Sequence, residues 1–390
     1  MNMKRIIAVI LCQLGAFCGL SIAFSQVANQ FRIEIPYVEE NGKFLVKAVI
    51  NGQPGRFLVD TGAPCCISDS FARRANIESI GQEAEGVDSN GEAVTNAVVN
   101  IESLRLDDKF TFSQLQAMKW PAGNVLENFK IDGVIGYNLF RQGIVKFDHR
   151  KHLLTFTNYD GGLGIDYSCA VPMIPDPYLT LLRVKLGKNS CDTVMFDSGA
   201  KAFYELSVKS FNRLETSDKK ALKVLGKGIG ALSIGAAGLE DASEKYRVCV
   251  PKFGIGNALF KNVTTITTDA QDSRIGSNFL LYGTVIIDYQ SNVFYYIPYD
   301  KKKTVDVYEK DWDVIITVMN DQLCAGLVWD YARLPLKGGE RIVEVNGARL
   351  EQVDTYKAIT QGYINMPGDK ATIVYVDEAG KEHEVTIRRR

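Results

Sequence analysis

One short phrase occurs twice in the chain and constrains the fold more than any other feature. It reads FLVDTGA at residues 57–63 and VMFDSGA at residues 194–200. A short apolar run that ends at a turn signal predicts a buried strand, and glycine permits a sharp turn with close backbone approach. Asp is rarely buried without a partner. Asp60 and Asp197, 137 positions apart, are therefore predicted to supply two halves of one site.

Other elements repeat at nearly the same offset. Gly136 and Gly276 lie in similar segments 140 residues apart, and Gly143 and Gly283, which open matching strands, are also 140 apart. An internal duplication explains this constant offset. Because the repeated unit is a whole β-rich lobe, the sequence predicts two fused lobes around a central cleft rather than a solenoid.

The chain of 390 residues is long enough for two or three domains. We divide it into a signal peptide (1–25), an N-terminal lobe (26–163), a C-terminal lobe (164–302) and a final domain (303–390). The last boundary follows a change in composition at three consecutive lysines, residues 301–303. The expected fold class is all-β for the lobes, followed by a small β-rich α+β domain.

The N-terminus has the pattern of an export signal. Lys4 and Arg5 precede a long apolar stretch, and small residues follow up to Ser25, which predicts cleavage after Ala23 or Ser25. A retained membrane anchor is the alternative, because the apolar stretch is long. With cleavage, we expect no membrane span and a location in the periplasm, on the cell surface or outside the cell. The net charge of −1 gives no indication of a nucleic-acid partner.

Six cysteines follow the predicted cleavage site. Export permits disulfides, and Cys169 with Cys191 is a plausible pair, although sequence alone cannot give the pairing. No two cysteines have Cys-x-x-Cys spacing, so we expect no structural zinc and no other metal. Cys65 and Cys66 lie beside the first motif, but a thiol nucleophile needs a histidine partner. The three histidines lie in no motif that recruits a cysteine: His149, His152 and His383.

Two carboxylates that share a site suit acid–base catalysis. They cannot both ionise easily, so one pKa rises and the other falls, and the pair holds one proton. One member can then deprotonate a water while the other protonates the carbonyl that the water attacks. This chemistry needs no cofactor.

At these residues the chain resembles aspartic proteases of the pepsin and retropepsin class, over residues 31–300. Ala63 is closer to retropepsins and the fused lobes are closer to pepsins. The resemblance implies that Asp60 and Asp197 are catalytic on a peptide or protein substrate. It also implies the residues that support this pair, namely Thr61, Gly62, Ser198 and Gly199, and a flap with Gly86, Asp88, Asn90 and Gly91. The apolar-apolar-Gly segment of that class is matched at residues 134–136, whereas Arg274 replaces its first residue in the second lobe.

A glycine-rich segment at residues 226–238 stands in the repeat where the first lobe has its flap. Its Gly-Lys pair is followed by Gly228 rather than Ser or Thr, which argues against a phosphate-binding loop. We expect a flexible loop over the cleft.

The final domain resembles a PDZ domain through GERIVEVNG at residues 339–347. The resemblance implies a groove that takes an extra strand and a peptide carboxylate. We expect the carboxylate loop at residues 321–327, with Cys324, Ala325, Gly326 and Leu327 as peptide-binding residues, and a helix around 353–359. The sequence therefore predicts an exported aspartic endopeptidase with a peptide-recruiting domain. The alternative is a catalytically inert peptide-binding protein of the same fold.

Overall fold

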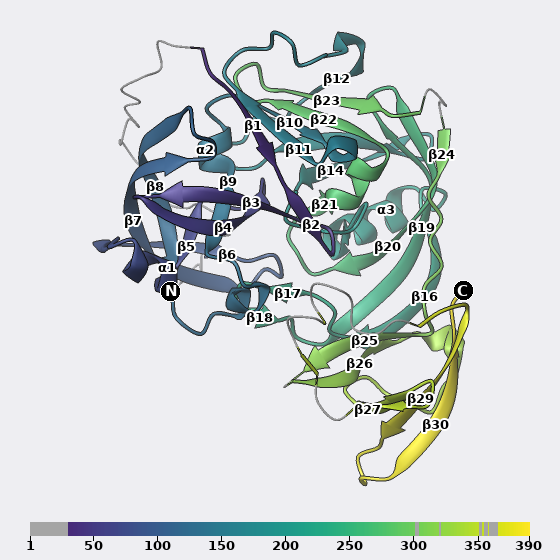
Figure 1. The fold of residues 1–390 in the computed structure, drawn as a ribbon. Coiled ribbons are helices and arrows are strands. Elements are labelled where there is room, and N and C mark those ends of the chain that lie inside the picture. The colour runs from purple at the N-terminus through teal and green to yellow at the C-terminus, as the bar shows by residue number, and fades with distance from the viewer. Residues whose placement is uncertain (1–29, 301–303, 320, 351–352, 355–357, 359–365) are drawn as a thin grey trace, which may run out of the picture.

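The computed structural model describes residues 30–300, 304–319, 321–350, 353–354, 358 and 366–390. The expected signal peptide at 1–25 lies outside the described residues. The described chain is mostly β-strand and forms two lobes with a smaller domain attached (Figure 1). The prediction of an all-β, two-lobed architecture is confirmed.

The first lobe is built on an eight-stranded sheet in the order β2-β3-β4-β9-β5-β8-β7-β6. From Val46 to Ile50 in β3 buried side chains alternate with more exposed ones, as a half-buried strand requires. Asn51 and Gly52 have φ of 47° and 79° and make the tight turn into β4, which ends at Asp60. The elements of this lobe are β2 (Val38–Glu40), β3 (Lys43–Ile50), β4 (Gln53–Asp60), β5 (Cys66–Ser68), α1 (Asp69–Arg74), β6 (Ser79–Val87), β7 (Ala93–Arg105), β8 (Thr111–Trp120), η1 (Val125–Phe129), β9 (Gly133–Gly136) and α2 (Tyr137–Phe140).

The second lobe repeats the arrangement around its own motif. Strand β14 ends just before Asp197 and pairs in parallel with β21, as β4 pairs in parallel with β9. The elements are β13 (Leu181–Leu186), β14 (Ser190–Phe196), β15 (Leu206–Ser207), α3 (Val208–Ser217), β16 (Lys223–Gly230), β17 (Ile234–Gly235), β18 (Gly238–Leu239), β19 (Ser243–Ile255), β20 (Ala258–Thr268), β21 (Ser273–Ile275) and η4 (Ser277–Leu281).

A six-stranded sheet joins the two lobes, in the order β1-β11-β10-β22-β23-β12. At its centre β10 and β22, the matching strands of the repeat, pair antiparallel from Ile144 with Asp288. One hydrophobic core runs through both lobes, so they are packed as one body. The elements here are β1 (Arg32–Pro36), β10 (Ile144–Asp148), η2 (His149–Lys151), β11 (Leu153–Thr157), η3 (Tyr167–Cys169), β12 (Ala170–Pro172), β22 (Gly283–Asp288) and β23 (Val293–Pro298).

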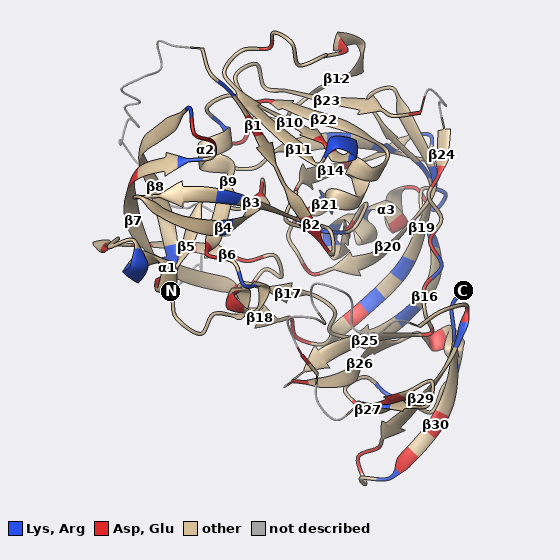
Figure 2. Ribbon diagram, in the orientation of Figure 1, with Lys and Arg blue, Asp and Glu red and all other residues tan. Residues whose placement is uncertain are grey.

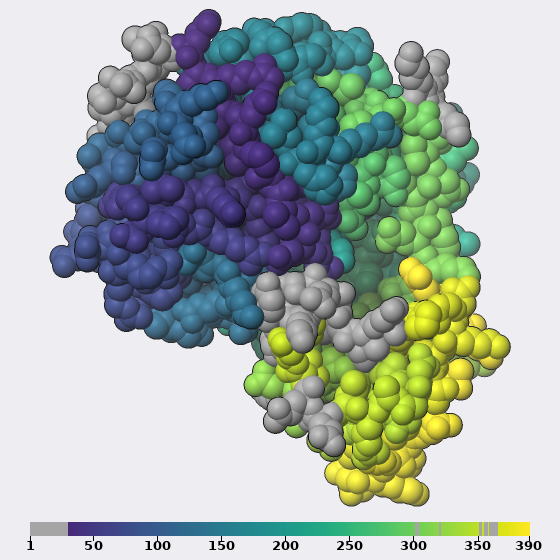
Figure 3. All heavy atoms as spheres, viewed as in Figure 1, coloured from purple at the N-terminus to yellow at the C-terminus, as the bar shows by residue number. Residues whose placement is uncertain are grey.

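The C-terminal domain has its own apolar core and packs against the second lobe (Figure 3). Its strand β26 pairs with β16 of that lobe at Leu327 and Gly230. A short strand, β24 (Thr304–Asp306), precedes this domain and pairs with β20. The elements of the domain are β25 (Val314–Met319), β26 (Gln322–Val328), η5 (Asp330–Ala332), β27 (Arg341–Val345), β28 (Ala348–Arg349), β29 (Lys370–Val376) and β30 (Glu382–Arg388). Charges of both signs are interspersed along the outer strands (Figure 2).

The glycine-rich segment at residues 226–238 was expected to be a flexible loop, but most of it lies in β-strands. Its first part, Gly226 to Gly230, lies in β16, and alternate glycines there face the C-terminal domain. A Cβ on Gly228 would lie 2.5 Å from the carbonyl oxygen of Val328, and one on Gly230 would lie 2.0 Å from that of Gly326. These glycines are therefore required because two backbones approach closely.

Two further expectations are corrected. The prediction of a carboxylate loop at residues 321–327 is wrong, because residues 322–327 of this segment lie in strand β26, in which Cys324, Ala325, Gly326 and Leu327 are buried. Their backbone is already used: Ala325 N–H donates to the Glu340 carbonyl, and the Gly326 carbonyl accepts from Ala231 N–H. The helix expected around 353–359 lies mostly outside the described residues.

The prediction of a disulfide between Cys169 and Cys191 is also wrong. Within the described chain all six cysteines are free thiols. Among the same residues, no helix is long and apolar enough to cross a membrane.

Candidate active site

The two motifs meet at the junction of the lobes and bind each other reciprocally. Thr61 N–H donates to Ser198 Oγ, and Ser198 N–H donates to Thr61 Oγ1, both at 3.0 Å. Each hydroxyl then donates across the junction, Thr61 to the Phe196 carbonyl at 2.9 Å and Ser198 to the Val59 carbonyl at 3.0 Å. Both side chains are fully buried. These four hydrogen bonds fix the relative position of the two turns.

The two carboxyl groups lie together because glycines leave room for them. A Cβ on Gly199 would lie 2.2 Å from Asp60 Oδ2, and one on Gly62 would lie 2.8 Å from the carboxyl carbon of Asp197. Backbone N–H groups hold each carboxyl from behind: Gly62 donates to Asp60 Oδ1 at 2.8 Å, and Gly199 and Ala200 donate to Asp197 Oδ1 at 2.8 and 3.1 Å. The sequence-predicted pair and its supporting residues are thus brought into one site.

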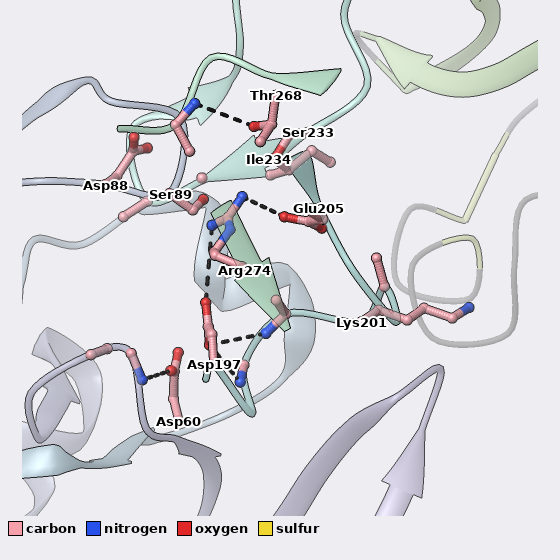
Figure 4. Close-up of a pocket in the computed structure, with 18 of the residues that line it drawn as sticks. Asp60, Asp88, Ser89, Asp197, Lys201, Glu205, Ser233, Ile234, Thr268 and Arg274 are labelled. Carbon is pink, nitrogen blue, oxygen red and sulfur yellow. Dashed lines mark hydrogen bonds and ion pairs between the residues drawn. The ribbon is translucent and has the colours of Figure 1, made fainter. Parts of the chain in front are cut away.

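The site is asymmetric in charge. Burial, followed by the charge of Asp197 and a hydrogen bond to it, raises the pKa of Asp60 to about 8. Asp197 accepts one more backbone N–H than Asp60 does, and its Oδ2 faces the Arg274 guanidinium at 3.9 Å (Figure 4). Hydrogen bonds and a nearby cation favour the charged form of a carboxyl. Asp60 is therefore favoured as the member that holds the proton.

A cleft of about 1670 Å³ opens over the pair. It is lined by both lobes and extends to Lys310, Trp312 and Arg389 at the base of the C-terminal domain. Lys43 of the first lobe donates to the Gly199 carbonyl, so the floor of the cleft is also tied across the lobes.

The predicted flap is a β-hairpin of β6 and β7, with Gly86, Asp88 and Gly91 in the cleft lining. Its tip binds a second hairpin, β17–β18, from the other lobe. Asn90 Nδ2 lies 3.3 Å from the carbonyls of both Ser233 and Gly238, and Asp88 Oδ2 accepts from Ala237 N–H at 3.0 Å. Both hairpins therefore cover the cleft together.

A buried ionic group anchors the second hairpin. Lys245, 1% exposed at its side chain, donates to Glu240 at 2.8 Å and to Asp269 at 2.7 Å. Glu240 Oε1 accepts from the N–H groups of Leu232 and Ser233, which lead into β17. Sequence reasoning missed this group, because its members are scattered and carry no motif. It also missed Glu205 as the partner of Arg274, although the departure at Arg274 was a visible signal.

The two cysteines beside the first motif are not placed for nucleophilic chemistry. Burial raises the pKa of Cys65 to about 12 and raises that of Cys66 further. His149 lies by Glu39, and His383 binds Asp377 in the C-terminal domain. Over the described ranges, no three His, Cys, Asp or Glu side chains are grouped as metal ligands.

A family model and a solved structure are each similar to part of this chain. Residues 46–139 match the family model described as aspartyl protease, which covers the first motif and the flap. Among solved structures, the aspartic proteinase from Irpex lacteus matches 69% of this chain and 97% of its own, at 13% identity and a TM-score of 0.42. No curated protein matched the sequence.

Proposed function

We propose that this protein is an aspartic endopeptidase that hydrolyses peptide bonds with a water activated between Asp60 and Asp197. The observation that carries the proposal is the buried, interlocked pair of carboxyl groups at the base of a large cleft. The family match over the first lobe supports it. Because both halves of the site are in one chain, no dimer is required.

The charge asymmetry assigns a role to each carboxyl group. Asp197, as carboxylate, takes a proton from the water while the water oxygen bonds to the peptide carbonyl carbon. Asp60, as carboxylic acid, donates its proton to the carbonyl oxygen. When the C–N bond breaks, Asp197 passes its proton to the leaving nitrogen, and one hydroxyl of the intermediate returns a proton to Asp60 as the C=O bond forms again. The released products are a carboxylic acid and an amine, and no covalent enzyme intermediate forms.

The competing function is a peptide-binding protein of the same fold with an inert pair. A mixed peptide library incubated with the mature chain and read by mass spectrometry separates the two. The proposal expects defined cleavage products that disappear when Asp60→Asn and Asp197→Asn are combined. Binding of peptides without products, or products that persist in the double variant, supports the alternative or another catalytic group.

We further propose that the C-terminal domain recruits the substrate, as its likeness to PDZ domains suggests. Two observations favour this role: the cleft continues to Trp312 just before β25, and within the described residues β25 pairs only with β26. An extended peptide could add to the open edge of β25. Substrates sharing one cleavage site but differing in length test the idea. Longer ones should show a lower KM at similar kcat, and a KM independent of length would remove the role.

The signal-like N-terminus suggests that the enzyme works outside the cytoplasm. We propose export, tested by fractionating cells that express the full chain and determining the mature N-terminus. A mature protein beginning after Ala23 or Ser25 supports it, and an intact N-terminus in the cytoplasm contradicts it.

A further inference from the structure

The two sides of the cleft beside the carboxyl pair carry equivalent but chemically different cross-strand pairs. In the first lobe Cys66 pairs with Val134. In the second lobe Glu205 pairs with Arg274 through reciprocal backbone hydrogen bonds of 2.8 and 2.9 Å. Val134 and Arg274 each stand two residues before the glycine behind their motif, so they are equivalent in the internal repeat. The repeat therefore places an apolar pair on one side and an ionic pair on the other.

The first-lobe side is an apolar pocket wall. Val134 packs in a cluster with Leu45, Trp120 and Ile131. The members of this cluster and its neighbours that line the cleft are Leu58, Ala63, Cys66, Trp120, Leu126, Phe129, Ile131 and Val134. A concave apolar wall of this kind takes an apolar side chain.

The second-lobe side offers an unused hydrogen-bond donor. Arg274 is 5% exposed and lines the cleft. Its guanidinium lies between Glu205, at 2.7 Å, and Asp197, at 3.9 Å (Figure 4). Its Nε–H has no hydrogen-bond acceptor among the residues that the structure describes. The Nε atom itself is shielded from solvent, so a ligand can reach only the small exposed part of the guanidinium that lines the cleft. Because a charged group with an unsatisfied donor is costly to bury, a ligand that supplies an acceptor to this exposed part gains from binding here.

The charges around this donor select among possible acceptors. Arg274 faces two carboxyl groups, so the wall has no surplus of positive charge to attract a third carboxylate. An amide side chain supplies an oxygen to accept from the guanidinium and an NH₂ to donate to a carboxylate. Glu205, whose side chain is 25% exposed, is the available acceptor for that NH₂.

We propose that Arg274 and Glu205 form a specificity subsite for glutamine or asparagine on one side of the cleaved bond, with an apolar residue on the other side. The inference rests on the proposed peptidase function. Such an enzyme would prefer substrates with an amide side chain at the second-lobe wall and an apolar side chain at the first-lobe wall. A cleft with two apolar walls would select apolar residues on both sides of the cleaved bond.

The test is a set of otherwise identical peptides that carry Leu on one side of the cleavable bond. The other side carries Gln, Leu, Glu or Lys, in both orders. The proposal expects kcat/KM for the best Gln peptide to exceed that of the Leu–Leu peptide by at least about tenfold, because a site built for hydrogen bonding rejects groups that cannot make them. Equal rates for Gln and Leu, or a preference for Glu or Lys, would overturn it. If none of the peptides is cleaved, the peptidase function itself is refuted instead.

Two variants identify the residues responsible. Glu205→Leu with Arg274→Met removes both members of the ion pair together, a replacement that proteins often tolerate. Because Arg274 also faces Asp197, the readout is the ratio of kcat/KM for Gln and Leu peptides within the variant rather than its absolute rate. The double variant should reverse the preference from Gln to Leu, while the requirement for Leu at the first-lobe side stays unchanged. Arg274→Lys keeps the charge but lacks the planar guanidinium with its several donors, and should reduce the preference for Gln over Leu several-fold. An undiminished Gln preference in either variant would contradict the assignment.

Discussion

Thr61 is the residue whose substitution tests the junction of the two lobes most cleanly. Thr61→Val keeps the shape of the side chain but removes the hydroxyl. The Ser198 N–H then loses its acceptor and the Phe196 carbonyl loses its donor. Each group is buried, and an unsatisfied buried group costs about 1–3 kcal/mol, so we expect a loss of about 2–6 kcal/mol.

Thermal unfolding measures this loss directly. For domains of 150–250 residues, 1 kcal/mol corresponds to a Tm change of about 2–4 °C, so Thr61→Val should lower Tm by roughly 4–24 °C. The matched control is Thr111→Val, which makes the same change at an exposed position in β8. Surface substitutions of this kind stay within about 0.5 kcal/mol. Equal Tm values for the two variants would refute the reasoning about the junction.

Three further predictions concern the acid, the hairpins and the C-terminal domain. The raised pKa keeps Asp60 protonated until the pH approaches about 8. We therefore expect kcat/KM to persist up to about pH 7 and to fall as the pH rises through 8, whereas activity that is already lost by about pH 5 would contradict the assignment. Gly235→Ala would place a Cβ 2.0 Å from Asp88 Oδ2, so it should separate the hairpin tips and lower kcat/KM with little change in Tm. The control is Gly254→Ala, whose Cβ would make ordinary contacts only. Equal activity of the two variants would argue against the two hairpins covering the cleft together. Ending the chain at residue 302 removes the carbonyls of Glu309 and Arg390 that accept hydrogen bonds from buried Arg247. The truncated protein should therefore have a lower Tm or aggregate. A folded truncated protein that cleaves short peptides normally and proteins poorly would show that the domain recruits substrate without stabilising the two lobes.

The duplicated phrase predicted the carboxyl pair because strand, turn and glycine requirements are local. A carboxyl group at a strand end and a glycine two residues later are both visible in the sequence, and the repeat supplied the second half. The flap hairpin was predictable for the same reason, since its turn residues are contiguous.

What the sequence did not predict depends on contacts between distant segments. Alternating glycines in β16 suggested a flexible loop, but they are required by the approach of β26 from about 100 residues further along the chain. Lys245 and Glu240 gave no signal, because a buried ion pair is defined by burial rather than by residue type. The placement of the carboxylate loop failed because an apolar run with one glycine fits a strand as well as a loop.

We propose that Asp60 and Asp197 act as one catalytic unit on a peptide bond. The most direct test is kcat/KM for a single identified peptide at about pH 6 with the wild type, Asp60→Asn, Asp197→Asn and the double variant. Residues that act as a unit have strongly non-additive effects, so each single variant should lose about as much activity as the double variant. Multiplicative losses, or a single variant that keeps most of its activity, would contradict the account.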